Sequence, residues 1–354
     1  MPINDICRMK LVQILLMPFS WIYSAVLFVR NWLFDHNLLK STRGKAQTVV
    51  VGNLSLGGTG KTPHSSLIIR ELSRHFSVAL LSRGYGRKSK GFYMLSTDSK
   101  ASQVGDEPLL LKKRNPTIPV AVCENRLEGI ELILREMPET KWVILDDAFQ
   151  HRALKGDVHV LLTEFDAPFF NDHVLPSGRL RDHKRQWRRA DVVIITKCPD
   201  TLTIGEMQSF VNQFPKLKSK QVFFSRMKYG IPRPVFNPDL IFDFDAQVFG
   251  FCGIARPASF QDHLEKHYSL KKFKFYPDHH AFTDADIATI RHDFGTFGLL
   301  SKMMLTTEKD AMRLLEFQEL KDEPIFYIPI EVEFIGENQN LTSALLDFMN
   351  RPVR

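Results

Sequence analysis

A glycine-rich segment between a strand-like run and a helix-like run restricts the fold of this chain more than any other feature. Thr48–Gly52 has the length and apolar character of a buried strand, and Pro63–His75 has a helical pattern with proline in its first turn. The intervening Gly57–Thr62 contains three glycines, which allow backbone N–H groups to turn toward an anion without interference from a Cβ atom. This order predicts a phosphate-binding loop leading into a helix N-terminus.

The segment fits the Walker A pattern G-x-x-x-x-G-K-[ST] except that serine replaces the first glycine. We expect Lys61 to reach the β- and γ-phosphates of ATP and the Thr62 hydroxyl to bind Mg²⁺. The alternative is a chance glycine-rich turn, which the strand before it and the helix after it disfavour. The predicted nucleotide-binding residues are Ser55, Leu56, Gly57, Gly58, Thr59, Gly60, Lys61 and Thr62.

A second metal-binding element follows the apolar run Trp142–Leu145, which ends in Asp146 and Asp147. An apolar strand that ends in a carboxylate is typical of a Walker B element, because Mg²⁺ lies at the C-terminal edge of the sheet. Neighbouring side chains on a strand point to opposite sides, so we expect one of the two aspartates to face the metal directly. The alternative is a solvated pair or a helix cap. Together with Thr62, both aspartates are predicted metal ligands.

Strand-like and helix-like runs alternate over most of the chain, which indicates an α/β fold with a parallel sheet covered on both faces. We predict a P-loop NTPase-type domain and a second, smaller α/β domain. Prolines at 232, 234 and 238 suggest an extended linker or β-ribbon between them. The predicted segments are an N-terminal apolar helix (1–40), a P-loop kinase core (41–220), the linker (221–246) and the C-terminal domain (247–354).

The N-terminal segment Leu11–Val29 has no charged residue, and Lys10 and Arg30 flank it. Its length is at the threshold for a membrane-spanning helix of about 18–20 residues, and Trp21 is an aromatic residue suited to an interface. We therefore predict a membrane-associated helix that either crosses the bilayer or lies in one leaflet. A signal peptide and a buried core helix are the alternatives; no convincing cleavage site follows the run.

The net charge of +7 favours acidic partners, and an anionic membrane surface is the one that the apolar N-terminus supports. No pattern typical of nucleic-acid binding is present, so we expect no nucleic-acid partner. The four cysteines have no zinc-site spacing. The basic run Arg179–Arg189 suits either a solvated helix face or attachment to anionic lipid or to a substrate phosphate.

Beyond these elements, a series of short motifs runs through most of the chain. In order, they are Gly52–Ser55, Gly57–Pro63, Ser82–Arg87, Gly105–Pro108, Asn125–Arg126, Asp146–Arg152, Leu175–Arg181, Phe251–Ile254, Asp278–His280 and Thr307–Ala311. With these motifs the chain resembles the tetraacyldisaccharide 4'-kinases, the lipid A 4'-kinases of Gram-negative bacteria. Serine in the Walker A window belongs to that family's pattern, whereas Ala148, Ser177, Arg179 and Asp182 depart from it, in the loops that follow the paired aspartates.

The resemblance implies an enzyme that transfers the γ-phosphate of ATP to the 4'-hydroxyl of an acylated glucosamine disaccharide 1-phosphate, giving lipid IVA. By position, Asp106 and His279 match the family's catalytic dyad, in which a carboxylate oriented or tuned by imidazole accepts the hydroxyl proton. Because the two residues fall in different predicted domains, we expect them to meet only on domain closure. Taken alone, Asp106 also suits a helix N-cap and His279 an ordinary loop histidine.

Lys61, Arg83 and Arg126 complete the predicted catalytic set. Guanidinium groups suit phosphate oxygens, although both arginines also suit a plain surface role. We expect the protein at the cytoplasmic face of the bacterial inner membrane, where it is peripheral or monotopic. The main alternative function is a membrane-associated P-loop ATPase that acts as a switch or partitioning protein, which shares the loop but gives no reason for Asp106 and His279 together.

Overall fold

The computed structural model describes residues 3–298, 301–336 and 340–349, with side chains from residue 12 onward. The chain forms two compact units, each built from segments that are separate in the sequence. The first unit contains Met1–Arg83, Ile118–Met227 and Val332–Arg354, and the second contains Gly84–Thr117 and Lys228–Glu331.

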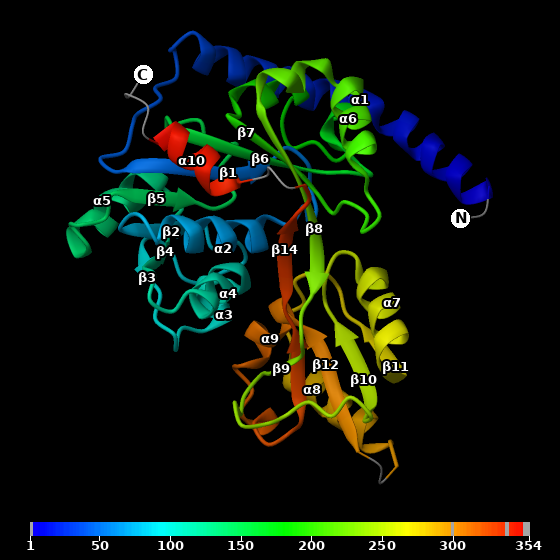
Figure 1. The fold of residues 1–354 in the computed structure, drawn as a ribbon. Helices are drawn as coiled ribbons and strands as arrows, with labels where there is room; N and C mark the ends of the chain where they lie inside the picture. Colours follow the sequence, from blue (N-terminus) through cyan, green and yellow to red (C-terminus); the bar gives the residue numbers. More distant parts are fainter. Residues whose placement is uncertain (1–2, 299–300, 337–339, 350–354) are drawn as a thin grey trace. The chain divides into compact units, whose positions relative to one another are not determined.

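The first unit is built on a parallel sheet whose strands are drawn from blue to green in Figure 1. Their order is β8-β7-β6-β1-β5-β2-β4, and each neighbouring pair in this series is parallel. Most of their side chains are buried, as expected for a parallel sheet that is covered on both faces. The strands are β1 (Gln47–Asn53), β2 (Val78–Ser82), β4 (Val120–Val122), β5 (Trp142–Leu145), β6 (Val158–Glu164), β7 (Val192–Thr196) and β8 (Gln221–Tyr229).

Helices cover this sheet, and α2 (Lys61–Leu72) packs on β1 and β2 directly after the glycine-rich loop. The side chain of Asn125 accepts N–H bonds from the first turn of α5 (Arg126–Glu136). A capping box at Thr203 begins α6 (Ile204–Gln213). α10 (Leu341–Met349) packs against α2 and β6. Three short 3₁₀ helices lie at Phe169–Asn171, Lys184–Arg189 and Pro215–Ser219.

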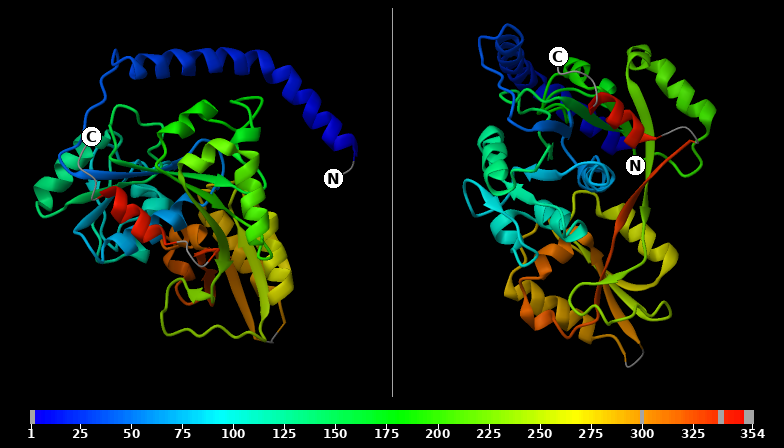
Figure 2. Two further views of the ribbon diagram at one scale, coloured as in Figure 1. Left: turned by 45° about the horizontal axis from the view of Figure 1, so that its top comes forward. Right: turned by 60° about the vertical axis from the view of Figure 1, so that its left-hand side comes forward.

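A single long helix, α1 (Ile3–Asp35), precedes the sheet. Its segment Val12–Asp35 has a mean hydropathy of 1.9 and is long and apolar enough to cross a membrane, as predicted. Figure 2 shows its N-terminal half extending beyond the strands of the first unit. Large apolar side chains such as Phe19, Trp21 and Ile22 are exposed on it.

The polar side chains of α1 attach its C-terminal half to the loop 174–183. The Ser20 hydroxyl donates to Ser177 Oγ at 2.8 Å, and the Asn31 amide donates to Asp182 Oδ1 at 2.7 Å. The Tyr23 hydroxyl also donates to the carbonyl oxygen of Arg181 at 3.1 Å. The polar side chains of α1 therefore face the protein and its apolar side chains face outward, which is the reverse of an ordinary surface helix.

The second unit has its own sheet, in the order β11-β10-β12-β13-β9, with β9 antiparallel and the other pairs parallel. Phe249, Phe251, Phe282 and Phe294 form much of one side of its core. Its elements are β3 (Tyr93–Met94), α3 (Ala101–Val104), α4 (Asp106–Arg114), β9 (Arg233–Pro234), β10 (Gln247–Cys252), α7 (Pro257–His267), β11 (Ser269–Phe275), α8 (Asp284–Gly295), β12 (Lys302–Thr307), α9 (Glu308–Leu314), the 3₁₀ turn Gln318–Leu320 and β13 (Ile325–Ile328), followed by β14 (Ile330–Phe334) at the boundary.

The fold class is as predicted, but the course of the chain through the units differs from the predicted boundaries. Residues 84–117, expected in the first domain, pack with the second unit, because α3 and α4 lie on α9 and the Arg114 side chain donates to the Glu308 carboxylate. The chain returns to the first unit at Val332, where β14 lies next to β8. The predicted linker 221–246 begins with β8, which is itself a strand of the first sheet.

Candidate active site

The glycine-rich loop joins the C-terminal end of β1 to the N-terminus of α2, as predicted. Gly60 has a φ of 86°, in the left-handed region, and a Cβ atom there would collide with the side chain of Met227. The left-handed backbone therefore favours glycine here, whereas the terminal methyl of Met227 belongs to a flexible side chain that can move aside. No side chain caps α2, so its first N–H groups remain available to an anion.

The side chain of Asn53, at the end of β1, makes several hydrogen bonds that hold the glycine-rich loop in place. Its amide nitrogen donates to the carbonyl oxygen of Ser55 and to the Thr59 hydroxyl, both at 2.8 Å. Its amide oxygen accepts from Lys61 Nζ at 3.5 Å and from the guanidinium of Arg181. The side chain of Asn53 is completely buried, so this network fixes the loop in an anion-binding shape.

The two aspartates after β5 have different surroundings. Asp146 is buried and accepts a hydrogen bond from the Ser65 hydroxyl of α2 at 2.8 Å. Asp147 accepts from Arg181 Nη2 at 2.7 Å and lies 3.8 Å from Lys61 Nζ. Burial alone raises the pKa of Asp147, but Lys61 and Arg181 more than offset this and hold the pKa below its ordinary value.

This arrangement fits a magnesium–nucleotide site. In the described part of the chain, no three His, Cys, Asp or Glu side chains form a cage for a metal ion. Mg²⁺ does not need one, since it is usually held by one or two carboxylates together with water and substrate phosphates. The Asp147 carboxylate beside Lys61, with the Thr62 hydroxyl next in the chain, supplies this type of donor set.

The predicted arginines lie close to this site but differ in burial. Arg126 is only 2% exposed; its Nη1 donates to the carbonyl oxygen of Cys123 at 2.7 Å, and its Nε is buried without a hydrogen-bond partner among the described residues. Burial lowers the pKa of Arg126 to about 10, and the neighbouring Arg83 contributes to this lowering. The side chain of Arg83 is exposed. A buried guanidinium near Asp146 and Asp147 reinforces the positive potential of the site.

In the second unit, Asp106 is the first residue of α4 and is 7% exposed. Its Oδ2 accepts from His279 Nδ1 at 3.2 Å and from Arg313 Nε and Nη2 at 3.0 and 2.5 Å. Its Oδ1 accepts from the N–H of Glu107 at 2.8 Å. Burial alone raises the pKa of Asp106, but the His279 hydrogen bond and the charges of Arg313 and Lys309 more than offset this, so the pKa is far below its ordinary value.

His279 and Asp106 were expected to meet only on closure of two domains. Instead both residues belong to the second unit, and their contact lies within it. His279 has a φ of 56°, its N–H donates to the carbonyl oxygen of Gly253 at 3.2 Å, and its ring lies edge-on to Tyr85. The hydrogen bond to Asp106 raises the pKa of His279.

The basic run after residue 178 is less exposed than its sequence indicated. Arg179 pairs with Asp172 at 3.0 Å, Arg181 binds Asp147, and Arg189 donates to the carbonyl oxygen of Phe149 while its guanidinium lies over the Phe149 ring. Lys184, Arg185 and Arg188 are the exposed members of the run. Arg181 therefore supports the phosphate loop, and attachment of the exposed residues to anionic lipid or to a substrate phosphate stays a prediction.

Three residues of the site escaped the sequence analysis: Asn53, Arg181 and Arg313. Asn53 and Arg181 lie in motifs that were recognised, but nothing in those motifs showed that their side chains meet across the loop. Arg313 carried a weak signal, since it lies three positions after Asp310 in the short helix α9, a spacing at which opposite charges can pair.

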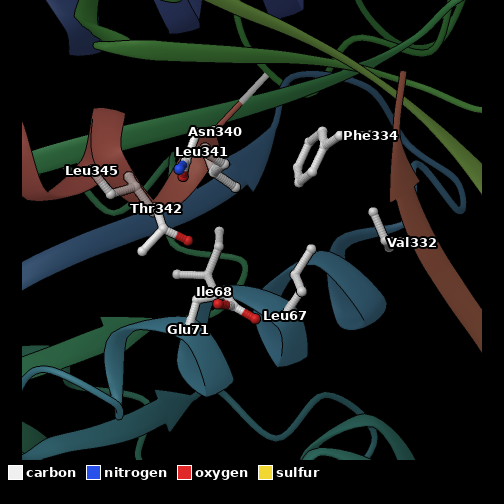
Figure 3. Close-up of a pocket in the computed structure, with 9 residues that line it drawn as sticks. All are labelled: Leu67, Ile68, Glu71, Val332, Phe334, Asn340, Leu341, Thr342 and Leu345. Carbon is white, nitrogen blue, oxygen red and sulfur yellow. The ribbon is translucent and has the colours of Figure 1, made fainter. Parts of the chain in front are cut away.

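A cavity of ≈ 340 Å³ lies away from these residues, between α2, β14 and α10. Figure 3 shows apolar side chains, among them Leu67, Phe334 and Leu345, around it. None of the predicted nucleotide-binding residues lines the cavity. It is therefore not the candidate nucleotide site.

The first strand of a parallel sheet leads here through a glycine-rich loop into a helix, and a lysine and an aspartate lie at this loop. This arrangement defines the class of P-loop phosphate-binding proteins. The model of the protein family described as tetraacyldisaccharide-1-P 4'-kinase matches residues 12–350 of this chain. The chain belongs to this family, and the resemblance found in its motifs is confirmed.

Individual relatives agree with this membership. The chain is 38% identical over 342 residues to the tetraacyldisaccharide 4'-kinase of Bacteroides thetaiotaomicron, covering 92% of this chain and 90% of the relative. It is 35% identical over 352 residues to that of Flavobacterium johnsoniae, covering 96% and 98%. A crystal structure of the "apo" form of LpxK from Aquifex aeolicus in complex with ATP is similar with a TM-score of 0.74 and 28% identity, covering 95% of this chain and 99% of the other.

Proposed function

We propose that the protein is an ATP-dependent kinase that phosphorylates the 4'-hydroxyl of a tetraacylated glucosamine disaccharide 1-phosphate to give lipid IVA. Its family membership over nearly the whole chain supports this reaction. The observation that carries the proposal beyond ATP binding is the hydrogen bond between Asp106 and His279. A P-loop switch or partitioning ATPase needs the loop, but it phosphorylates no acceptor hydroxyl and so does not require a proton-accepting pair in a second unit.

The loop residues have separate tasks in this reaction. The N–H groups from Gly57 to Thr62 hold the phosphates of ATP, and Lys61 supplies positive charge at the β- and γ-phosphates. Thr62 with Asp147, or Asp146 behind it, would hold Mg²⁺, which when bound neutralises charge that develops on the phosphates. Arg126 and Arg83 add fixed positive charge near the aspartates.

The acceptor side needs a group that removes a proton from a sugar hydroxyl as the new bond to phosphorus forms. Asp106 and His279 form a pair of the right type, because a carboxylate and an imidazole in contact share a proton-accepting role. For transfer, the acceptor hydroxyl must lie against this pair and the γ-phosphate at the same time, which also excludes water as a competing acceptor.

We also propose that α1 lies in one leaflet at the cytoplasmic face of the bacterial inner membrane and does not cross it. Ser20, Tyr23 and Asn31 are bonded to the loop 174–183, so this half of the helix has a protein neighbour along its length. Its exposed apolar residues face outward, as in a helix inserted at an interface. A lipid substrate can then reach the enzyme without leaving the membrane.

Replacement of Asp106 tests the acceptor side. We expect Asp106→Ala to lower the rate of lipid phosphorylation by about 10²- to 10⁴-fold and to leave ATP affinity almost unchanged, because Asp106 lies outside the unit that carries the loop. Turnover with lipid and equilibrium binding of ATP are measured on the same preparation. A variant that loses ATP binding together with turnover would show that Asp106 has only a structural role.

A further inference from the structure

Two histidines outside the candidate active site lie one turn apart on α7. His263 and His267 are four positions apart in this helix, a spacing that places both side chains on one face. Their ring centroids are 4.6 Å apart, with an angle of 41° between the ring planes. Figure 1 shows α7 beside β10 and β11, and neither histidine belongs to the residues of the proposed kinase reaction.

The ring nitrogens of this pair are not used by the rest of the protein. Within the described part of the chain, neither ring makes a hydrogen bond or an ion pair. His267 is exposed, and His263 is partly buried. The nitrogens of both rings are therefore available to a ligand that comes from solvent.

The ring of His263 is held in one orientation by its aromatic neighbours. It stacks on the ring of Tyr229 at 4.0 Å with an angle of 25°, and the ring of Tyr268 lies edge-on at 5.9 Å. Tyr229 also packs against Phe260 of the same helix. A side chain that is already ordered loses little rotamer entropy when it binds a ligand.

The surroundings of the pair suit a metal ion, which binds the neutral form of imidazole. Burial and the neighbouring His267 lower the pKa of His263 to about 4, so this ring is neutral at neutral pH. His267 is the last residue of α7, and the negative end of the helix dipole favours a cation there.

The separation of the two rings agrees with two ligands of one ion. At a metal–nitrogen distance of about 2.0–2.1 Å, each ring centroid lies roughly 3.2 Å from the metal, so two rings bound at a right angle have centroids about 4.5 Å apart. The observed separation of 4.6 Å is close to this value. Right angles between ligands are typical of tetragonal Cu²⁺ and Ni²⁺ sites, whereas tetrahedral Zn²⁺ needs centroids roughly 5.2 Å apart.

We propose that His263 and His267 form a surface site for one divalent transition-metal ion, which takes Cu²⁺ or Ni²⁺ in preference to Zn²⁺ and keeps water at its other positions. Over the described residues, no third His, Cys, Asp or Glu side chain joins the pair, so the bound ion stays open to exchange. Mg²⁺ and Ca²⁺ are not expected at this site because they prefer oxygen ligands. The site belongs to the second unit and does not depend on the proposed kinase reaction.

Equilibrium titration of the full-length, untagged protein with Cu²⁺ tests this proposal, in excess Mg²⁺ that occupies the aspartates after β5. We expect His267→Gln to lose one equivalent of bound Cu²⁺, because removal of the intramolecular second bond weakens its affinity by about 10²-fold or more. The replaced side chain is exposed, so the fold should not change. His292→Gln, at an exposed histidine of α8, is the matched control and should bind Cu²⁺ as the wild type does.

Electron paramagnetic resonance of the bound Cu²⁺ identifies its ligands directly. The wild type should show coupling to two imidazole nitrogens at this equivalent, and Ni²⁺ and Zn²⁺ should displace Cu²⁺ in that order of strength. Equal affinities and identical spectra for the wild type and His267→Gln would overturn the proposal. Coupling to a single nitrogen in the wild type, or tighter binding of Zn²⁺ than of Cu²⁺, would contradict it as well.

Discussion

Asp146 and Asp147 show how two identical neighbours acquire different roles. Ser65 of α2 binds the carboxylate of Asp146, which is 1% exposed, so this residue joins β5 to the helix that begins at the loop. Asp147 has a φ of 47° and turns out of the strand direction toward Lys61 and Arg181. The left-handed backbone at Asp147 brings its side chain beside the lysine of the phosphate loop.

We therefore expect Asp147→Asn to weaken the apparent affinity for Mg²⁺ by about 10- to 100-fold and to affect binding of metal-free nucleotide much less. Removing the negative charge takes away a donor that a hard cation prefers. Titration of Mg²⁺ in the transfer assay measures the change. Asp98→Asn, at an exposed loop aspartate of the second unit, is the control and should show no change; equal effects in both variants would exclude a metal-binding role for Asp147.

His64 is a buried titratable residue directly behind the phosphate loop. Its Nδ1 lies 2.7 Å from the carbonyl oxygen of Gly60, and its Nε2 lies 2.9 Å from Ser225 Oγ on β8. A carbonyl oxygen only accepts, so the neutral ring carries its hydrogen on Nδ1 and Ser225 donates to Nε2. Burial lowers the pKa of His64 to about 4, although the Gly60 hydrogen bond opposes this.

This residue predicts an acid-sensitive contribution to stability. The unfolded chain binds a proton at His64 below about pH 6.5, whereas the folded chain does so only below about 4. The free energy of unfolding therefore falls as the pH is lowered through this window, by at most about 1.4 kcal/mol per pH unit. His64→Asn should lose less stability than the wild type in urea unfolding between pH 7 and 5, while the exposed His75→Asn should behave like the wild type. Parallel pH profiles for all three proteins would refute this assignment.

At the scale of elements, α1 is the proposed membrane-binding helix and is also part of the first unit. Deleting it would remove the Asn31 amide that binds the completely buried Asp182 and leave its Oδ1 with the N–H of His183, and a poorly satisfied buried charge is destabilising. A deletion therefore cannot separate loss of membrane binding from loss of the fold. Single substitutions on the outward face of α1 are the better test.

Ile22→Asp is such a substitution, at a position that is 66% exposed. Burying an isoleucine side chain in a membrane contributes about 1.5–3 kcal/mol, so the variant should bind anionic phospholipid vesicles about tenfold or more weakly, with ATP affinity unchanged. Ile204→Asp on α6, also 66% exposed, is a matched control. Sedimentation with vesicles measures both. If Ile204→Asp weakens binding as much as Ile22→Asp, or neither does, α1 is not the membrane-binding element.

The sequence predicted where strands lie along the chain better than it predicted which unit each segment belongs to. The apolar runs located β5 at the residues where it occurs and β1 to within one residue at each end, because apolar runs in a parallel sheet are sharply bounded. The segment 84–117 lies between two strands of the first sheet, so its position in the chain gave no sign that α4 packs on α9. Such long-range pairing depends on side-chain contacts, for example that of Ser102 with Glu316, that no local pattern reveals.

At the scale of the whole molecule, the residues of the proposed reaction are divided between the two units. The first holds the phosphate loop with Asp147 and Arg126, and the second holds Asp106, His279 and Arg313. Short, local motifs identified these members except Arg313. The assignment of Asp106 to the first domain followed from chain order alone, and the contact of Asp106 with His279 and Arg313 corrects it.

Transfer of label from γ-labelled ATP to purified tetraacyl disaccharide 1-phosphate, with Mg²⁺ and the full-length protein, tests the central claim most directly. We predict that labelled phosphate enters the lipid in equal amount to the ADP formed, that it is attached at the 4'-hydroxyl, and that little ADP forms without the lipid. Release of labelled inorganic phosphate at the same rate with and without the lipid, with no label in the lipid, would contradict the account and favour a P-loop ATPase.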